Sequence, residues 1–164
     1  KVMTTIDKTT IKEFNLKRYL GKWYEIARFN HRFERGLQGV TAEYSLREDG
    51  KVKVLNCGHK HTLTGEQTCT TGKARLPKDG QSGKLEVSFF LFFYSDYNIL
   101  ELGKDYEWAL VGSSTDKYLW ILSRTPQLPS ETLNYLLEKA RLRGYDTSKL
   151  IFVEQPATLS KGSL

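Results

Sequence analysis

The sequence predicts an all-β protein: an eight-stranded antiparallel up-and-down β-barrel, with a helical turn before it and one α-helix packed outside it. Three observations predict this fold class. Short segments that alternate apolar and polar residues run from Lys22 to Arg124, turn-forming residues separate them at roughly ten-residue intervals, and one helical pattern follows. A β-sandwich is the alternative architecture, and it would enclose no cavity.

Regular structure begins with a helical turn and continues with the strands. Asn15 is a good N-cap for residues 16–20, and Gly21 is expected to end that turn. Strands are predicted at residues 22–30, 39–46, 51–57, 67–76, 84–90, 97–102, 106–112 and 118–124. Eight strands closed into a barrel leave no exposed edge, and they enclose a space just large enough for side chains or one small ligand.

The alternation is clearest in the second strand. Val40, Ala42, Tyr44 and Leu46 are apolar, and the residues between them are polar. Residues 71–76 and 84–89 follow the same period of two, so each of these strands has one buried and one solvated face. Turn-forming residues at 48–50, 77–80 and 112–116 separate the strands.

A helical periodicity follows the eighth strand. Leu133, Leu136 and Ala140 share one face of a helix predicted over residues 130–143, capped by Ser130 and ended by Gly144. That face is expected to dock on the outside of the barrel. Residues 150–154 predict a short strand, and the tail from 156 to 164 is expected to be loose. All 164 residues are expected to form one domain, with the barrel at about residues 22–125.

Composition and charge exclude several classes of protein. Hydrophobic residues make up 39% of the chain, which is enough for a packed core, and no apolar run approaches the length of a transmembrane helix. Residues 1–11 lack the apolar run of a secretory signal. The formal net charge is +6, but the basic residues are scattered, so no nucleic-acid partner is expected. Weak attraction to an anionic membrane surface is compatible with that charge.

Three short motifs resemble a known family. A Gly-x-Trp motif at Gly21 and Trp23 opens the first strand, Asp105 and Tyr106 precede the seventh, and Arg124 ends the eighth. In this order and spacing they resemble the three conserved blocks of the lipocalins. The resemblance implies a structural role for all five residues, with Trp23 at the closed end and Arg124 over its ring. Such a cation–π contact is worth about 1–2 kcal/mol when desolvated.

Longer segments are similar to one subgroup, the bacterial outer-membrane lipoprotein lipocalins, which are related to apolipoprotein D and the plant temperature-induced lipocalins. The similar segments are 18–29, 31–37, 40–46, 87–90 and 118–126, and the resemblance extends from about Phe14 to Pro156. It implies a carrier or store for a fatty acid or lysophospholipid, located in the periplasm and associated with the outer membrane. Members of the subgroup carry a lipid-modified N-terminal cysteine, and no cysteine stands near Lys1.

Strand parity and the loops at the open end predict the ligand-binding residues. Parity turns Ala27 or Phe29 inward, together with six residues of other strands, although plain core packing would give the same pattern. The loops near residues 30–38 and 91–96 carry apolar rings, which suggest a lid, a capped rim or a docking patch. The predicted ligand-binding residues are Phe29, Ala42, Tyr44, Val54, Ala74, Val87, Phe89, Phe33, Arg35, Phe92 and Phe93.

The two cysteines flank a hairpin loop, and parity places Cys57 and Cys69 together on the outer face. We expect a disulfide between them in an oxidising compartment. With His59 and His61 they also offer four zinc ligands, but the spacing fits no usual zinc motif, and no metal is predicted.

The sequence shows no recognisable catalytic motif. It contains no pattern that pairs a nucleophile with a general base, and none that pairs two carboxylates. The protein is therefore expected to be no enzyme and to need no cofactor. Two alternatives to a lipid carrier remain open. One is a carrier of a tetrapyrrole or other pigment, and the other is an interaction module that forms a homodimer through the aromatic rim of Phe92 and Phe93.

Overall fold

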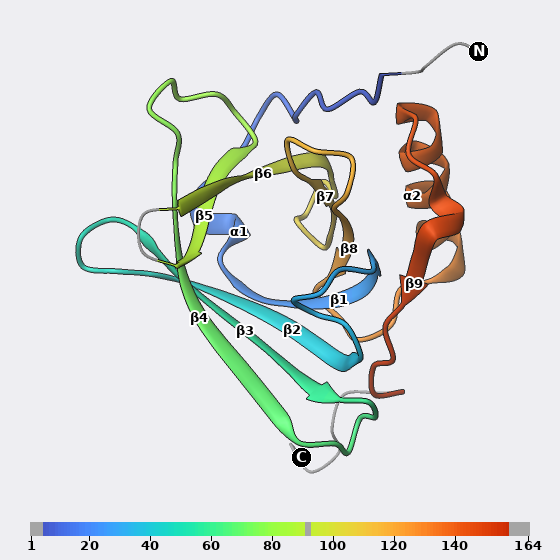
Figure 1. The fold of residues 1–164 in the computed structure, drawn as a ribbon. Helices are drawn as coiled ribbons and strands as arrows, with labels where there is room; N and C mark the ends of the chain where they lie inside the picture. The colour runs from blue at the N-terminus through green and yellow to red at the C-terminus, as the bar shows by residue number, and fades with distance from the viewer. Residues whose placement is uncertain (1–4, 91–92, 158–164) are drawn as a thin grey trace.

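The computed structural model describes residues 5–90 and 93–157, and its strands form a closed antiparallel barrel (Figure 1). The barrel strands are β1 (Gly21–Phe29), β2 (Leu37–Leu46), β3 (Val52–Lys60), β4 (Gln67–Arg75), β5 (Lys84–Phe90), β6 (Phe93–Leu102), β7 (Trp108–Gly112) and β8 (Leu119–Ser123). Each strand pairs with the next along the chain, and β1 pairs with both β2 and β8, so the sheet closes on itself. The predicted eight-stranded barrel is confirmed.

Two helices and a ninth strand complete the chain. The turn α1 (Leu16–Tyr19) begins after Asn15, whose side chain accepts a hydrogen bond from the Arg18 N–H, and it ends at Leu20 rather than at Gly21. Helix α2 spans Ser130–Arg143 as predicted, and Gly144 ends it with a left-handed φ of 105°. The predicted cap was wrong: Pro129 precedes the helix, and Ser130 is its first helical residue. The short helix η1 (Thr147–Lys149) then leads into β9 (Leu150–Phe152), which pairs with β1.

The apolar residues divide into one cluster inside the barrel and one outside it. The inner cluster contains Trp23, Tyr44, Val54, Ala74, Ile99, Val111 and Leu122, among others. The outer cluster brings Leu136 and Ala140 of α2 against outward-facing residues of β1, β7 and β8. Figure 1 shows α2 and β9 side by side on the outside of the barrel. The predicted docking of the helix on the outer face is confirmed.

The closed end of the barrel is sealed around Trp23, which is fully buried. The guanidinium carbon of Arg124 lies 3.8 Å from the centroid of the Trp23 ring. Its nitrogen atoms also donate hydrogen bonds to the backbone carbonyls of residues 18, 20, 22 and 106. Gly21 has a φ of 104°, and a Cβ there would lie 3.3 Å from an Arg124 nitrogen, so glycine fits both the backbone and the close contact.

The other two residues of the family motif lie in the turn between β6 and β7. The Tyr106 hydroxyl accepts a hydrogen bond from the Asn15 N–H at 2.8 Å, and the Arg18 guanidinium lies over the Tyr106 ring. Asp105 is exposed, and its backbone N–H donates to the Glu107 carboxylate. Tyr106 therefore ties the N-terminal turn to the closed end.

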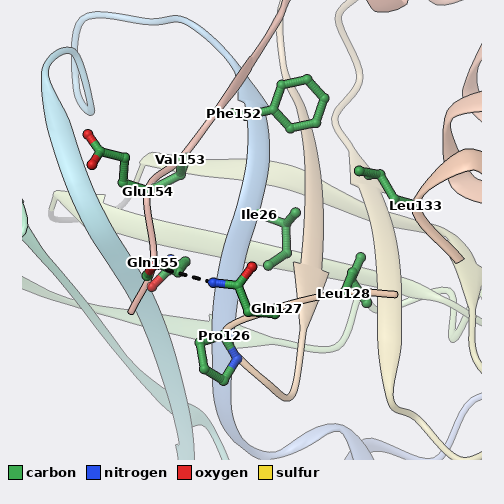
Figure 2. A pocket seen from close by; sticks show the side chains of 9 residues that line it. All are labelled: Ile26, Pro126, Gln127, Leu128, Leu133, Phe152, Val153, Glu154 and Gln155. Carbon is green, nitrogen blue, oxygen red and sulfur yellow. Dashed lines mark hydrogen bonds between the residues drawn. The ribbon is translucent and has the colours of Figure 1, made fainter. Parts of the chain in front are cut away.

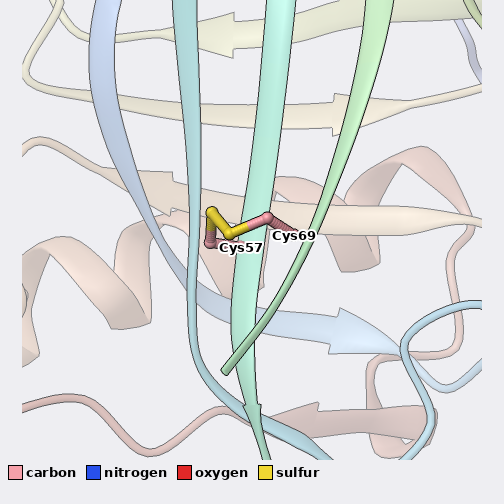
Figure 3. Close-up of a disulfide and its surroundings, with 2 residues drawn as sticks. All are labelled: Cys57 and Cys69. Carbon is pink, nitrogen blue, oxygen red and sulfur yellow. A yellow bond between two sulfur atoms is a disulfide. The ribbon is translucent and has the colours of Figure 1, made fainter. Parts of the chain in front are cut away.

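A disulfide joins Cys57 of β3 to Cys69 of β4 on the outer face of the sheet, as predicted (Figure 3). The two residues are direct partners in the register of β3 and β4, with their Cα atoms 4.1 Å apart. Because both sulfur atoms are bonded to each other, neither is available as a zinc ligand. Among the described residues, no three His, Cys, Asp or Glu side chains gather as a metal site would require.

Replacing both cysteines by serine is expected to lower the free energy of unfolding by about 2–3 kcal/mol, because the bond closes a short loop in the unfolded chain. Urea denaturation of the wild type and of Cys57→Ser/Cys69→Ser measures the difference. Reducing the wild type with dithiothreitol should give the same loss. A double variant as stable as the oxidised wild type would contradict the prediction.

Within the described ranges, no helix is long and apolar enough to cross a membrane. Of the tail that is predicted to be loose, residues 158–164 lie outside the part of the chain that the structure describes.

Candidate functional site

The inside of the barrel is the candidate site because several inward-facing side chains are incompletely packed. Ala42, Val87, Tyr97 and Trp120 pack against the inner cluster yet stay only partly buried. These side chains lie above the packed floor around Trp23, on the part of the inner wall that is not fully buried.

Six of the predicted lining residues face the interior, and they differ in how far they are buried. Tyr44, Val54 and Ala74 are buried in the inner cluster, so they are part of its packing. Ala42 and Val87 are partly buried against the same cluster. Phe89 is 43% exposed, and its ring lies against the inner face of Gly72, where an added Cβ would come within 2.5 Å of a ring carbon.

The prediction for Phe29 was wrong, because β1 contains an irregularity. The pairing of β1 with β8 shifts register between Glu25 and Ala27, and this β-bulge reverses the alternation that follows. Phe29 consequently faces outward and packs in the outer cluster, with its ring centroid 6.1 Å from that of Tyr145. Ala27, the other residue that parity suggested, is also in the outer cluster.

Two of the four predicted rim residues lie on the loop between β1 and β2. Phe33 is 69% exposed on the loop between β1 and β2, with Arg32 over its ring at 5.0 Å. Arg35 is exposed on the same loop. Phe92 lies outside the described residues, and Phe93 is described only through the backbone pairing that begins β6. A role for these two rings in ligand contact or in dimerisation stays a prediction.

The bulge also turns Arg28 into the barrel, where it is 1% exposed. Its Nη1 lies 3.6 Å from Oε1 of Glu25, which is itself 5% exposed. The guanidinium also donates to loop carbonyls, at 2.7 Å to the Glu34 oxygen and at 3.5 Å to the Leu37 oxygen. Arg28 therefore fastens the loop between β1 and β2 to the barrel wall.

The Glu34 carboxylate completes this buried polar cluster of Glu25, Arg28, His31, Glu34 and Trp120. Its Oε1 accepts hydrogen bonds from Trp120 Nε1 at 3.0 Å and from His31 Nε2 at 2.7 Å. The buried Glu25 carboxyl also interacts with the Glu34 carboxylate, and two negative charges so close together favour one proton between them. Within the described chain, Glu25 Oε1, Arg28 Nε and His31 Nδ1 have no hydrogen-bond partner.

The shared proton resides on Glu25. Burial, and then the neighbouring Glu34 carboxylate, raise the pKa of Glu25 well above its ordinary value. Burial by itself would also raise the pKa of Glu34, but hydrogen bonds from His31, Glu25 and Trp120 outweigh it and lower the Glu34 pKa to about 2. At neutral pH the cluster thus combines a neutral Glu25, an ionised Glu34 and a cationic Arg28.

Sequence reasoning missed most of this polar cluster, although part of it was within reach. Glu25 lies two residues after Trp23, so the parity that buries Trp23 also turns Glu25 inward. Arg28 would face outward by strict alternation, and only the bulge turns it inward. The loop residues His31 and Glu34 belong to no strand pattern, so no periodicity could place them.

Replacing Glu25 by glutamine is expected to stabilise the protein progressively as the pH rises above about 4.5. In that range the unfolded wild type has released the Glu25 proton and the native state still holds it, so wild-type stability falls with pH, by at most about 1.4 kcal/mol per pH unit. Glutamine carries no such proton. Glu34 has the opposite effect on the pH dependence of stability. Its contribution to the free energy of unfolding is present above pH 4.5 and is lost as the pH falls toward 2.

Urea denaturation of the wild type and of Glu25→Gln at several pH values between 5 and 8 measures this effect. Exposed Glu43→Gln, on β2, is the matched control. A stability difference between Glu25→Gln and the wild type that stays constant over this range would contradict a raised pKa at Glu25.

A separate pocket of about 340 Å³ lies outside the barrel wall. Figure 2 shows it between Ile26 of β1, the segment that leads into α2, and the chain that follows β9. The side-chain amide of Gln127 donates to the backbone oxygens of Gln155 and Pro156 at its edge. Its lining residues lie on the outer side of β1, so this pocket is distinct from the barrel interior.

Comparison with known proteins identifies the family to which this chain belongs. The model of the lipocalin-like domain matches residues 14–155, which is most of the chain. The chain belongs to the lipocalin family. The motif residues at the closed end, Gly21, Trp23, Asp105, Tyr106 and Arg124, all lie within the matched range.

Curated relatives of this lipocalin include bacterial, plant and animal proteins. It is 49% identical over 148 residues to the outer membrane lipoprotein Blc of Citrobacter freundii, covering 90% of this chain and 83% of that protein. It is 40% identical over 149 residues to temperature-induced lipocalin-1 of Arabidopsis thaliana, covering 85% and 78%. It is 37% identical over 153 residues to apolipoprotein D of Mus musculus, covering 88% and 78%. The resemblance to the bacterial subgroup is confirmed.

Solved structures agree on the fold of this lipocalin. Insecticyanin from the tobacco hornworm Manduca sexta superimposes with a TM-score of 0.73 at 22% identity, covering 92% of this chain and 86% of that one. Lobster apocrustacyanin A1 superimposes with a TM-score of 0.71 at 21% identity, covering 87% and 81%.

Proposed function

We propose that this lipocalin binds a single-chain lipid, a fatty acid or a lysophospholipid, inside its barrel and stores or carries it. The observation that supports the proposal is the set of inward-facing side chains that stay accessible above the packed floor: Ala42, Val87, Phe89, Tyr97 and Trp120. The side chains of Ala42, Val87 and Phe89 are wholly hydrocarbon, which suits an alkyl chain.

The alkyl chain of the ligand would set its affinity. Burying about 14–16 methylene groups at about 0.8 kcal/mol each contributes about 11–13 kcal/mol. Association and chain ordering cost several kcal/mol of that, which leaves a dissociation constant in the micromolar range or below. A partly hydrated ion pair at the mouth adds only about 1 kcal/mol.

The polar cluster under the first loop would contact the head group. The Arg28 guanidinium in this cluster would favour an anionic head by its charge, and exposed Arg35 on the same loop would tune that choice. Replacing Arg35 should therefore shift head-group preference and leave the binding of an alkyl chain nearly unchanged.

The proposal extends to the location of the protein and to its mode of action. The bacterial relatives are outer membrane lipoproteins, which supports a periplasmic, outer-membrane-associated location for this chain. We propose that it acts by binding alone, without catalysis and without a cofactor. The disulfide supports this, because it leaves neither Cys57 nor Cys69 as a thiol nucleophile.

Calorimetric titration of the delipidated protein with stearic acid, its lysophospholipid and a diacyl phospholipid tests the proposal. We expect one-to-one binding of both single-chain lipids and exclusion of the diacyl lipid. Val87→Trp, which fills the interior, should weaken binding at least ten-fold, whereas Leu55→Trp on the outer face of β3 is the matched control. Absence of binding by any lipid to a folded protein would contradict the proposal. Visible absorption of the freshly purified protein would favour a pigment instead.

A further inference from the structure

Three tyrosine hydroxyls meet inside the barrel, beside its floor. They belong to Tyr19 of α1, Tyr44 of β2 and Tyr97 of β6, and we call them the tyrosine triad. The Tyr97 hydroxyl oxygen lies 2.6 Å from that of Tyr19 and 3.0 Å from that of Tyr44. The Tyr19 ring in turn packs on Trp23, with 4.9 Å between centroids. The triad therefore lies directly above the closed end.

One of the three O–H groups of the triad has no acceptor within the triad. Each hydroxyl carries a single hydrogen, so the three can donate three hydrogen bonds. They make two among themselves, and within the described chain their oxygens have no other partner. An open chain of hydroxyls always leaves one O–H directed outside it. That leftover donor is costly to bury unless something accepts its hydrogen.

The triad stays protonated, and one of its three residues is only partly buried. Burial raises the pKa of Tyr44 to about 12 and moves the pKa values of Tyr19 and Tyr97 upward as well, so all three remain neutral donors. Tyr19 and Tyr44 are buried, whereas Tyr97 is only partly buried. A ligand that fills the barrel would thus reach the triad with its inner end.

The charge around the triad favours a neutral acceptor over a carboxylate. Arg124 is the cation beside it, and its nitrogen atoms are already bonded to four backbone carbonyls on the far side of Trp23. A carboxylate at the floor would therefore be desolvated without a free cation to pair with. A hydroxyl or keto oxygen avoids that cost and still accepts the spare hydrogen.

We propose that the tyrosine triad is a hydrogen-bonding subsite for a neutral oxygen at the inner end of the bound chain, so that the preferred ligands are acyl chains with a hydroxyl or keto group near their far end. This inference rests on the proposed binding of single-chain lipids in the barrel. It adds a selectivity that a plain apolar pocket would not have, because such a pocket excludes a terminal hydroxyl.

Paired titrations with saturated fatty acids from lauric to stearic acid and with their ω-hydroxy counterparts test the subsite. In the wild type, at the chain length that spans the interior, the ω-hydroxy acid should bind at least as tightly as the plain acid. In Tyr19→Phe/Tyr44→Phe/Tyr97→Phe, the ratio of the two affinities should fall by about ten-fold or more, because the hydroxyl then enters an apolar floor. Tyr145→Phe, in the outer cluster, is the matched control and should leave the ratio unchanged.

The outcomes separate the two proposals. If plain acids bind and every ω-hydroxy acid binds ten-fold weaker to the wild type, the subsite is wrong and the lipid carrier stands. If the ratio is the same in the triple variant, the subsite is also wrong. If no fatty acid binds, both proposals fail. Should the triple variant not fold, Tyr44→Phe/Tyr97→Phe and the wild-type series decide the question, because each compares two ligands on one protein.

Discussion

Replacing Trp23 by alanine is expected to lower the free energy of unfolding by about 3–5 kcal/mol. Trp23 is fully buried between the Tyr19 ring and the Arg124 guanidinium, and its Nε1 donates to the Tyr19 carbonyl at 2.9 Å. Alanine would leave a cavity at the floor and remove the partner of the cation. Urea denaturation followed by far-ultraviolet circular dichroism measures the loss.

Trp108→Ala is the matched control for that experiment. Trp108 is partly buried on the outer face of β7, where its ring lies 5.7 Å from that of Tyr135 of α2. Its replacement should cost about 1–2 kcal/mol, because less surface is withdrawn from water. Equal losses for the two variants would contradict the structural role given to the closed end.

Replacing Arg28 by methionine is expected to cost about 3 kcal/mol or more, because partly buried backbone carbonyls of the loop lose a charged hydrogen-bond donor. The change leaves the Glu34 carbonyl without its 2.7 Å donor and the Glu25 carboxyl without a nearby cation. Methionine has a similar length, so the effect reports lost polar contacts more than lost volume. The loop between β1 and β2 should also exchange its amide hydrogens faster.

Arg35→Met on the same loop provides the comparison for Arg28. Arg35 is exposed, and a surface substitution of this kind usually changes stability by less than about 0.5 kcal/mol. Thermal and urea denaturation of both variants, with amide exchange of residues 30–37, separates the two positions. A loss below 1 kcal/mol for Arg28→Met would show that the buried polar cluster does not hold the loop.

The fold was predictable because several of its strands alternate over most of their length and its turns are marked by glycine, proline and aspartate. The segment from Val40 to Leu46 shows this: its period of two, read from the sequence alone, matches the inward positions of Ala42 and Tyr44. The disulfide followed from the same parity, because Cys57 and Cys69 lie on one face at the same distance from their hairpin.

The polar parts of the site depend on features that periodicity does not encode. One bulge in β1 exchanged the faces of Phe29 and Arg28, so a single local irregularity moved a charge into the barrel. The tyrosine triad joins residues that are up to 78 positions apart, and only the closed barrel brings their hydroxyls together. Such contacts arise from tertiary structure and leave no local signal in the chain.

The three tryptophans of this chain allow a direct measurement of where the ligand lies. Trp120 faces the interior, whereas Trp108 lies on the outer wall against α2. Titration with a stearic acid brominated at mid-chain should therefore quench the emission of Trp120 in Trp23→Phe/Trp108→Phe. In Trp23→Phe/Trp120→Phe, the emission of Trp108 should stay unchanged. Quenching of Trp108 without quenching of Trp120 would place the lipid outside the barrel and contradict the proposed function.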